Sequence, residues 1–332
     1  MVTTDGANLL PPASVLGMGA VTALGRDLDA VARRLEQSYS APGGIARVSD
    51  DLSDTAINGQ MRRADRFAKM AAIAAVDAWN AAGMKESSVA GEHIGLILSS
   101  GFGPHGRGFR FLDGILDNGD GAASPTDFSH SVHGAASAYI SRLLDIRGPS
   151  LPLTDFEMGF EQAVQLAQAW LNDGTCDRVL IGAAEELGEV MLHCAATMLR
   201  EWPGIVPGEG AVFFMLAPTA VPGAATVNAA ADPVKADLLI VEDPPLPSSV
   251  AHRSSILAPE TVTFASYFGH SASGAAFDML GGLLAMRAGR TLGRVIHRDA
   301  QLATPTRRID IAATSRTSSD ARTATLLMTK VS

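Results

Sequence analysis

The segment Gly148-Pro149-Ser150-Leu151-Pro152-Leu153-Thr154-Asp155-Phe156-Glu157 decides how this chain is interpreted. Glycine and proline open the segment, and the residues after them predict a short strand that runs into the start of a helix. A side chain at such an elbow lies at a helix N-terminus, where the helix dipole favours a negative charge. The residue at that place is Glu157.

The composition indicates a globular protein with a large core. The 332 residues suffice for one large domain or two fused halves, and 47% of them are hydrophobic. Aromatic residues are few while 33 residues are glycine, which favours helices packed closely on buried sheets. The net charge of −9 and the absence of a basic stripe argue against nucleic acid and against anionic membranes as partners.

The sequence also bears on compartment and cofactors. Met1 to Pro12 lacks the basic and apolar regions of a secretory signal, and no run of about 18 apolar residues occurs, so we expect a cytoplasmic protein. The two cysteines, Cys176 and Cys194, are predicted to be reduced structural thiols, because neither lies in a C-x-x-C pair. No metal or other cofactor is expected.

Hydrophobic periodicity predicts alternating strands and helices. Strands are expected at 13–24, 94–99, 178–184, 236–241, 309–313 and 325–330, and helices at 27–37, 63–82, 162–172 and from within 261–285 to Arg287. The stretch Pro222–Val234 is rich in proline, glycine and alanine and is predicted to be a loop.

Three motifs resemble those of the β-ketoacyl synthases. The opening segment is similar to their nucleophile elbow, G-P-S-x-T-V-x-T-A-C, with Glu157 at the position of the nucleophilic cysteine. Ser124–Ser137 is similar to the S-P-T-x-F-x-x-S-V-H-N-A-x-A stretch of short, divergent ketosynthase-like proteins of aryl-polyene and related carrier-protein systems. Tyr267–Ala276 is similar to K-S-x-x-G-H-x-x-G-A-A-G and keeps the histidine, as His270.

The resemblance implies a fold and a division of the chain. We expect the α/β thiolase fold, layered αβαβα, built from two pseudo-repeated halves of which the second is shortened. Residues 13–220 would form the N-terminal ketosynthase-like half, and residues 235–332 the abbreviated C-terminal half. No internal repeat is detectable in the sequence itself.

Four departures from the family pattern indicate lost catalysis. Glu157 replaces the cysteine, and a carboxylate cannot form the thioester that a thiolate forms. No H-G-T-x-T segment occurs between Gly210 and His270, and Ala265 replaces the lysine of the third motif. The family's glycine-rich gating loop, N-x-F-G-F-G-G-x-N, is here Thr314–Ala321, without glycine.

Two interpretations of Glu157 stay open. It is either a repurposed acid or base, paired with His270, or a structural carboxylate that accepts the amides of a helix N-terminus. His270 is either a residual catalytic histidine or a packing residue kept after catalysis was lost.

Several other side chains are expected beside a subunit interface or an acyl tunnel. His130 and His133 lie three residues apart, a spacing that would place both on one helix face and suggest a metal site, but no third ligand has suitable spacing. The resemblance instead places this region beside the dimer contact. The predicted tunnel or interface residues are Phe128, His130, His133, Tyr139, Phe156 and Phe160.

The function implied is that of a chain-length factor. Such a non-catalytic ketosynthase homologue heterodimerises with an active ketosynthase and shapes its acyl tunnel in polyketide, polyene or fatty-acid-type biosynthesis. The acyl carrier protein would reach it indirectly, through the partner. Two alternatives remain: a malonyl-carrier-protein decarboxylase that uses Glu157 and His270, and a homodimeric acyl-binding scaffold.

Overall fold

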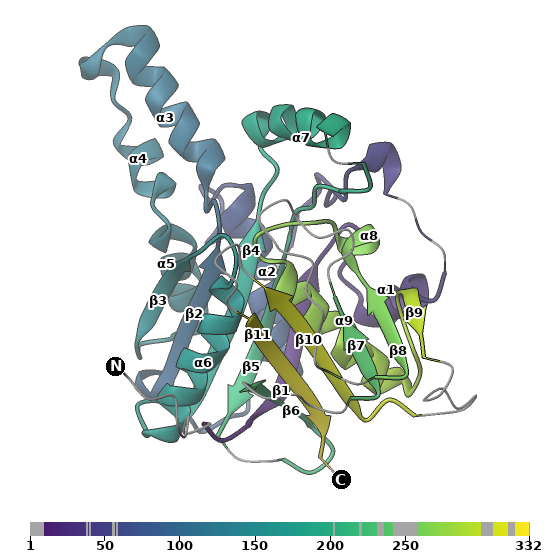
Figure 1. Ribbon diagram of the computed structural model, residues 1–332. Helices are drawn as coiled ribbons and strands as arrows, with labels where there is room; N and C mark the ends of the chain where they lie inside the picture. Colours follow the sequence, from purple (N-terminus) through teal and green to yellow (C-terminus); the bar gives the residue numbers. More distant parts are fainter. Residues whose placement is uncertain are drawn as a thin grey trace, which may run out of the picture.

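The computed structural model shown in Figure 1 describes residues 10–37, 39, 41–54, 57, 59–201, 203–218, 221–230, 236–241, 256, 258–299, 308–317 and 323–331. Its strands form one eleven-stranded mixed sheet in the order β3-β2-β4-β5-β1-β6-β11-β10-β7-β8-β9. The strands are β1 (Ala13–Val21), β2 (Ile94–Ser100), β3 (Ser150–Thr154), β4 (Arg178–Glu185), β5 (Gly210–Ala217), β6 (Ala225–Ala230), β7 (Leu238–Ile240), β8 (Glu260–Thr263), β9 (Arg294–Arg298), β10 (Ile311–Thr317) and β11 (Thr323–Lys330).

The helices lie mainly between these strands in sequence, although α3, α4, α5 and α7 fall outside the predicted helix ranges. They are α1 (Leu28–Leu35), α2 (Arg66–Ala81), α3 (His105–Asn118), α4 (Pro125–Ser131), α5 (Gly134–Leu144), α6 (Gly159–Asn172), α7 (Glu189–Glu201), α8 (Ala265–Phe268) and α9 (Gly274–Ala288). Asp27 and Asp65 are the N-caps of α1 and α2, because their side-chain oxygens accept hydrogen bonds from backbone N–H groups in the first turns. The second helix therefore begins three residues later than predicted.

The strand order reveals the two pseudo-repeated halves. In the first half β3, β2 and β4 are parallel, β5 is antiparallel to β4, and β1 is antiparallel to β5. The second half repeats this pattern with β8, β7 and β10 parallel, β11 antiparallel to β10, and β6 antiparallel to β11. The repeat thus survives in topology although the sequence does not show it.

Two helices form a middle layer between the halves. Helix α6 packs on β2 and β4 and reaches β6, whereas α9 packs on β10, β11 and β7, and the two helices touch. Residues Gly274–Met286 of α9 are all buried, as expected for a helix covered on every side. On its other face the first half is covered by α2, which packs on β1, β4 and β5, and α5 packs on α2 (Figure 1).

Close packing of α2 on the sheet depends on glycines in β1. A Cβ atom at Gly17 or Gly19 would overlap the backbone of α2. The alanine-rich helix presents small side chains to the sheet, and ten of its residues are buried. Small residues in both β1 and α2 therefore let this helix, the outer layer of the first half, lie close against the sheet.

The shortening of the second half falls on its outer layer. Residues 22–93 connect β1 to β2 and carry α1 and α2, but only residues 231–237 connect β6 to β7, too few for a helix of α2's 16 residues. Within the described ranges no helix covers that face of the second half. A small apolar cluster lies there instead, formed by Ala236, Leu239, Ile256, Ala258 and Ala313.

Two local predictions were wrong. The predicted loop Pro222–Val234 contains strand β6, Ala225–Ala230, while residues 231–234 lie outside the described residues. This strand pairs with β1 on one side and β11 on the other, so distant partners override a weak local pattern. Likewise Thr314–Thr317 continue β10 instead of forming a loop, and residues 318–321 are not described.

Candidate functional site

The start of α6 is the place that the sequence singles out. Asp155, two residues before Glu157, accepts hydrogen bonds through Oδ1 from the backbone N–H groups of Glu157 at 2.7 Å and Met158 at 2.8 Å. Its Oδ2 accepts from the Gln162 side chain at 3.0 Å. Asp155 thus holds the two backbone amides that precede α6, and Glu157 lies half-buried just before the helix.

Aromatic side chains surround this helix start. The Phe156 ring is 59% exposed and packs against Phe102, with ring centroids 5.0 Å apart. Phe102 in turn lies edge-on to His105, whose ring lies near Phe109. Phe160, by contrast, is buried in the core against Phe214, so it faces the interior of this chain.

A buried carboxylate that the sequence analysis did not consider lies beneath Phe156. Glu185, the last residue of β4, accepts hydrogen bonds from the N–H groups of Gly101 and Phe102. The hydroxyls of Ser100 and Ser273 also donate to it, at 3.2 and 2.9 Å. Burial raises the pKa of this carboxyl, although the four donors oppose that shift. Two glutamates directly after an apolar strand are the signal that could have revealed it.

The neighbouring Glu186 anchors the start of α3. Its Oε1 accepts the Gly106 N–H at 3.0 Å and lies 3.9 Å from Nδ1 of His105. His105 Nε2 in turn accepts the Gly188 N–H at 3.4 Å. Burial raises the pKa of Glu186 to about 7, while burial lowers that of His105. Helix α3 is thus fixed to the end of β4 by a carboxyl that titrates near neutrality.

The unfolding free energy should therefore depend on pH through Glu186. An unfolded glutamate titrates near 4.5, so between about pH 4.5 and 7 the folded chain keeps a proton that the unfolded chain has lost. Stability falls as pH rises through this window. Glu186→Gln should match the wild type at pH 4.5 and exceed it by up to about 3 kcal/mol at pH 8, in urea denaturation at both pH values.

The exposed Glu86 offers a matched control, since Glu86→Gln changes the same charge without touching a buried site. This control should leave the pH slope as it is in the wild type. An unchanged slope in Glu186→Gln as well would contradict the assignment.

His270 is held by the backbone of the segment before β5. It is 5% exposed, and its Nδ1 lies 3.0 Å from the Val206 N–H, which donates to it. A β-bridge joins His270 to Pro207, and Gly208 and Gly269 approach so closely that a Cβ on either would overlap the other's backbone. These contacts account for the retained G-H pair by packing, independently of any pairing with Glu157.

The histidine pair is divided between two helices. His130 lies in α4, and its Nε2 is 2.6 Å from the hydroxyl of Tyr139 on α5, with the two rings stacked. His133 lies outside α4 at the start of α5, with its ring against Gly103. The helical spacing that suggested a shared face is broken at Val132. Among the described residues, no group of three or more metal-ligating side chains could hold an ion.

A buried cation lies close to the position of the absent lysine. Ala265 borders a cavity of about 10 Å³ that is also lined by Arg316 of β10 and Asp278 of α9. Arg316 Nε is 3.9 Å from an Asp278 carboxylate oxygen, and both side chains are nearly buried. The Arg316 guanidinium occupies the space beside Gly274, where any Cβ would overlap it. Strand β10, which stands where the family has its gating loop, thus places the charge of Arg316 beside α9 in the middle layer.

Two further observations concern the cysteines and membrane spanning. Burial raises the pKa of the Cys176 thiol to about 11, which fits a structural cysteine. In the part of the chain that is described, no helix combines the length and apolar character needed to cross a membrane.

The comparisons with known proteins agree with this architecture. A search of curated proteins finds no match. Among the solved structures that match, three are similar over 97% of this chain and 100% of theirs. They are a type II polyketide synthase acyl-carrier protein in complex with its ketosynthase bound to the hexaketide (14% identity, TM-score 0.74), the ishigamide ketosynthase/chain length factor (15%, 0.72) and a β-ketoacyl synthase from Burkholderia phymatum (16%, 0.73).

These similarities establish the thiolase-type ketosynthase fold that the motifs implied. The family model of the β-ketoacyl synthase N-terminal domain matches residues 25–220, more than half of the chain. The match includes the elbow before α6 and the strands on which Glu185 and Gly210 lie. This chain is a member of the β-ketoacyl synthase family.

Proposed function

We propose that this protein is a non-catalytic ketosynthase homologue, a chain-length factor that heterodimerises with an active ketosynthase and shapes its acyl tunnel. The observation that carries the proposal is an apolar surface on and around the α3–α4 hairpin, which projects from the rest of the chain (Figure 1). We call it the hairpin face. Its exposed apolar side chains are Phe102, Phe109, Leu112, Leu116, Phe128, Val132, Leu151 and Phe156.

The hairpin face has the properties of a protein interface. Large exposed apolar side chains gathered on one projecting segment are typical of interaction sites, and aromatic residues are enriched in such sites. The hairpin is braced internally, since Arg107 and Arg110 of α3 both bind the Asp127 carboxylate of α4. A braced, apolar projection is preorganised to meet a partner.

The free edge of β3 extends this surface. Strand β3 ends the sheet, and its Leu151 is 38% exposed. An edge strand offers unpaired backbone groups to another chain. The resemblance to ketosynthases implies that such a strand edge is buried across the dimer axis, and one of the similar structures is described as a ketosynthase/chain length factor.

The residues at and near the elbow before α6 support a non-catalytic role. Glu157 is not a thiolate, and His270 makes contacts that packing alone explains. His130 of α4 and Tyr139 of α5, which are hydrogen-bonded to each other, are the side chains that we assign to the wall of a shared acyl tunnel, together with Phe128 and His133. With a net charge of −9, this chain suits an acidic carrier protein poorly, so we place carrier docking on the partner.

Co-expression with an active ketosynthase tests the proposal. We expect a one-to-one complex in size-exclusion chromatography with light scattering, and a shifted product length when Tyr139→Phe or Phe128→Ala replaces the wild type in that complex. A stable homodimer that ignores the synthase would contradict heterodimerisation. Unchanged products by mass spectrometry would contradict the role in the tunnel.

Restoring a thiol should not restore condensation. Glu157→Cys supplies the nucleophile, but the H-G-T-x-T histidine and the lysine at Ala265 are still absent, and both histidines are needed to stabilise the extender carbanion. We expect no condensation product and no acetyl-carrier formation from malonyl-carrier protein, for Glu157→Cys and for the wild type. Turnover that is lost in Glu157→Ala would instead favour the decarboxylase alternative.

A further inference from the structure

The two halves of the sheet are joined by a short stretch of strand pairing and then diverge. Strand β1 pairs with β6 only from Ala13 to Val15, against Val227 to Ala225. Its pairing with β5 continues as far as Val21, with a bulge between Val15 and Gly17. Beyond Val15 the second edge of β1 therefore has no strand partner in the described ranges. The space between the diverging halves extends to the C-terminal end of α9.

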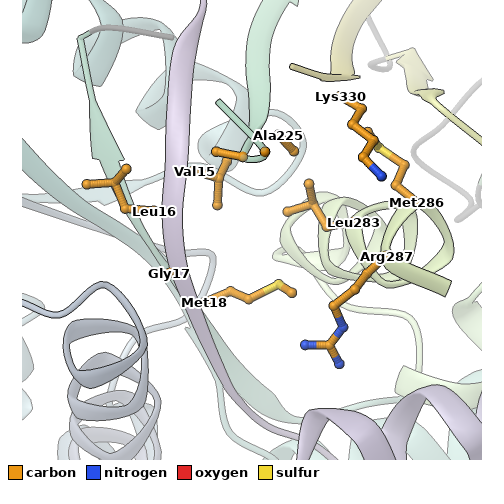
Figure 2. A pocket seen from close by; sticks show the side chains of 11 residues that line it. Val15, Leu16, Gly17, Met18, Ala225, Leu283, Met286, Arg287 and Lys330 are labelled. Carbon is orange, nitrogen blue, oxygen red and sulfur yellow. The ribbon is translucent and has the colours of Figure 1, made fainter. Parts of the chain in front are cut away.

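A pocket of about 340 Å³ occupies this wedge, and we call it the seam pocket. Figure 2 shows Val15 and Met18 of β1 facing Leu283 and Met286 of α9. The full lining is Val15, Leu16, Gly17, Met18, Gly223, Ala224, Ala225, Leu283, Met286, Arg287 and Lys330. Its volume falls in the range of small-molecule sites, about 300–1,000 Å³, and most of its side chains are apolar.

Both charged residues of the seam pocket are cations. Arg287, at the end of α9, binds Asp29 of α1 through one nitrogen at 2.5 Å, which leaves other N–H groups of its guanidinium to donate. Lys330 is half-buried at the end of β11 and forms no ion pair within the described residues. None of the described lining residues carries a carboxylate, although the chain as a whole has a charge of −9.

We propose that the seam pocket binds a small carboxylate with an unbranched apolar body, of the kind represented by a medium-chain fatty acid. The apolar side chains of β1 and α9 would cover the body. Lys330 would hold the carboxylate at the rim, where charge-assisted hydrogen bonds are strong, and Arg287 would add positive charge to the pocket. A cationic ligand would be repelled, and a neutral one would leave Lys330 without an ion pair.

The seam pocket is separate from the surfaces used in the proposed function. Its residues come from β1, α9, the start of β6 and the end of β11, and none belongs to the hairpin face or to the elbow before α6. A ligand here would lie between the two halves of one chain. Ligand binding in the seam pocket can therefore be tested independently of heterodimerisation.

Titration calorimetry with the full chain tests the proposal, using decanoate as the probe. We expect decanoate to bind with one-to-one stoichiometry, decanol to bind at least about tenfold more weakly, and decyltrimethylammonium not to bind. No binding of decanoate, or equal binding of decanol, would overturn the proposal.

Two variants locate the site. Lys330→Gln should weaken decanoate binding about tenfold, and Ala224→Phe should abolish it by filling the pocket. The matched control is Lys69→Gln, which removes a half-buried lysine from a different hollow, beside Asp50 and Arg66, and should change nothing. Thermal melting shows whether each variant folds. Equal weakening by Lys69→Gln, or full binding by folded Ala224→Phe, would overturn the assignment.

Discussion

Glu185→Ala should lower the free energy of unfolding by about 3 to 5 kcal/mol, the largest effect on stability that we expect from one substitution. The carboxylate joins three elements, because its donors lie at the end of β2, in the residues that follow it, and immediately before α9. Removing it leaves the Gly101 and Phe102 amides and two hydroxyls without their acceptor in a buried place. The cost is therefore that of several unsatisfied donors at once.

Urea denaturation followed by circular dichroism measures this effect, and two variants calibrate it. Glu185→Gln keeps the shape and one acceptor oxygen, so it should cost less than Glu185→Ala. Glu189→Ala removes a glutamate exposed in the first turn of α7 and should stay within about 0.5 kcal/mol of the wild type. If Glu185→Ala is no more destabilising than Glu189→Ala, the network does not stabilise the fold.

The double variant Leu116→Asp with Phe128→Asp should weaken the complex with an active ketosynthase by at least about a hundredfold. Both side chains are exposed in the free chain, at 80% and 56%, so their replacement costs the folded subunit little. In a complex the two aspartates would be buried without partners on an apolar surface, and each such loss at the centre of an interface amounts to about 2 kcal/mol or more.

Co-purification and sedimentation equilibrium would measure this loss of association. Ile296→Asp is the matched control, because Ile296 is 37% exposed on β9, at the opposite edge of the sheet from β3. The control should bind the ketosynthase like the wild type. Retention of the complex by the double variant would show that the hairpin face is not the interface.

Part of the first half of the fold can be predicted from the sequence, but helices α3, α4, α5 and α7 were not predicted. The caps at Asp27 and Asp65, the apolar run of β4 and the alanine-rich face of α2 are local signals, and they lead to the correct elements. Strand β6 has no such signal, since Ala225–Ala230 becomes a strand only through β1 and β11. Elements whose hydrogen bonds are all made with distant strands cannot be read from their own composition.

The candidate site was predictable in part. Motif spacing led to the correct helix start and to His270, but it did not indicate that Asp155 holds the two amides just before that helix. Glu185 escaped notice because its importance arises from four donors that come together only in the folded chain. Residue types at fixed spacing indicate a site, whereas the identity of its buried acceptor depends on tertiary contacts.

The narrow seam between β1 and β6 has a mechanical consequence. Three residue pairs connect the halves by strand pairing, and the rest of the junction is made by α6, α9 and their apolar neighbours. Backbone hydrogen bonds fix both distance and angle, but apolar contacts between helices allow small sliding movements. The angle between the two halves is therefore set mainly by the packing of α6 and α9, and only over three residue pairs by backbone hydrogen bonds.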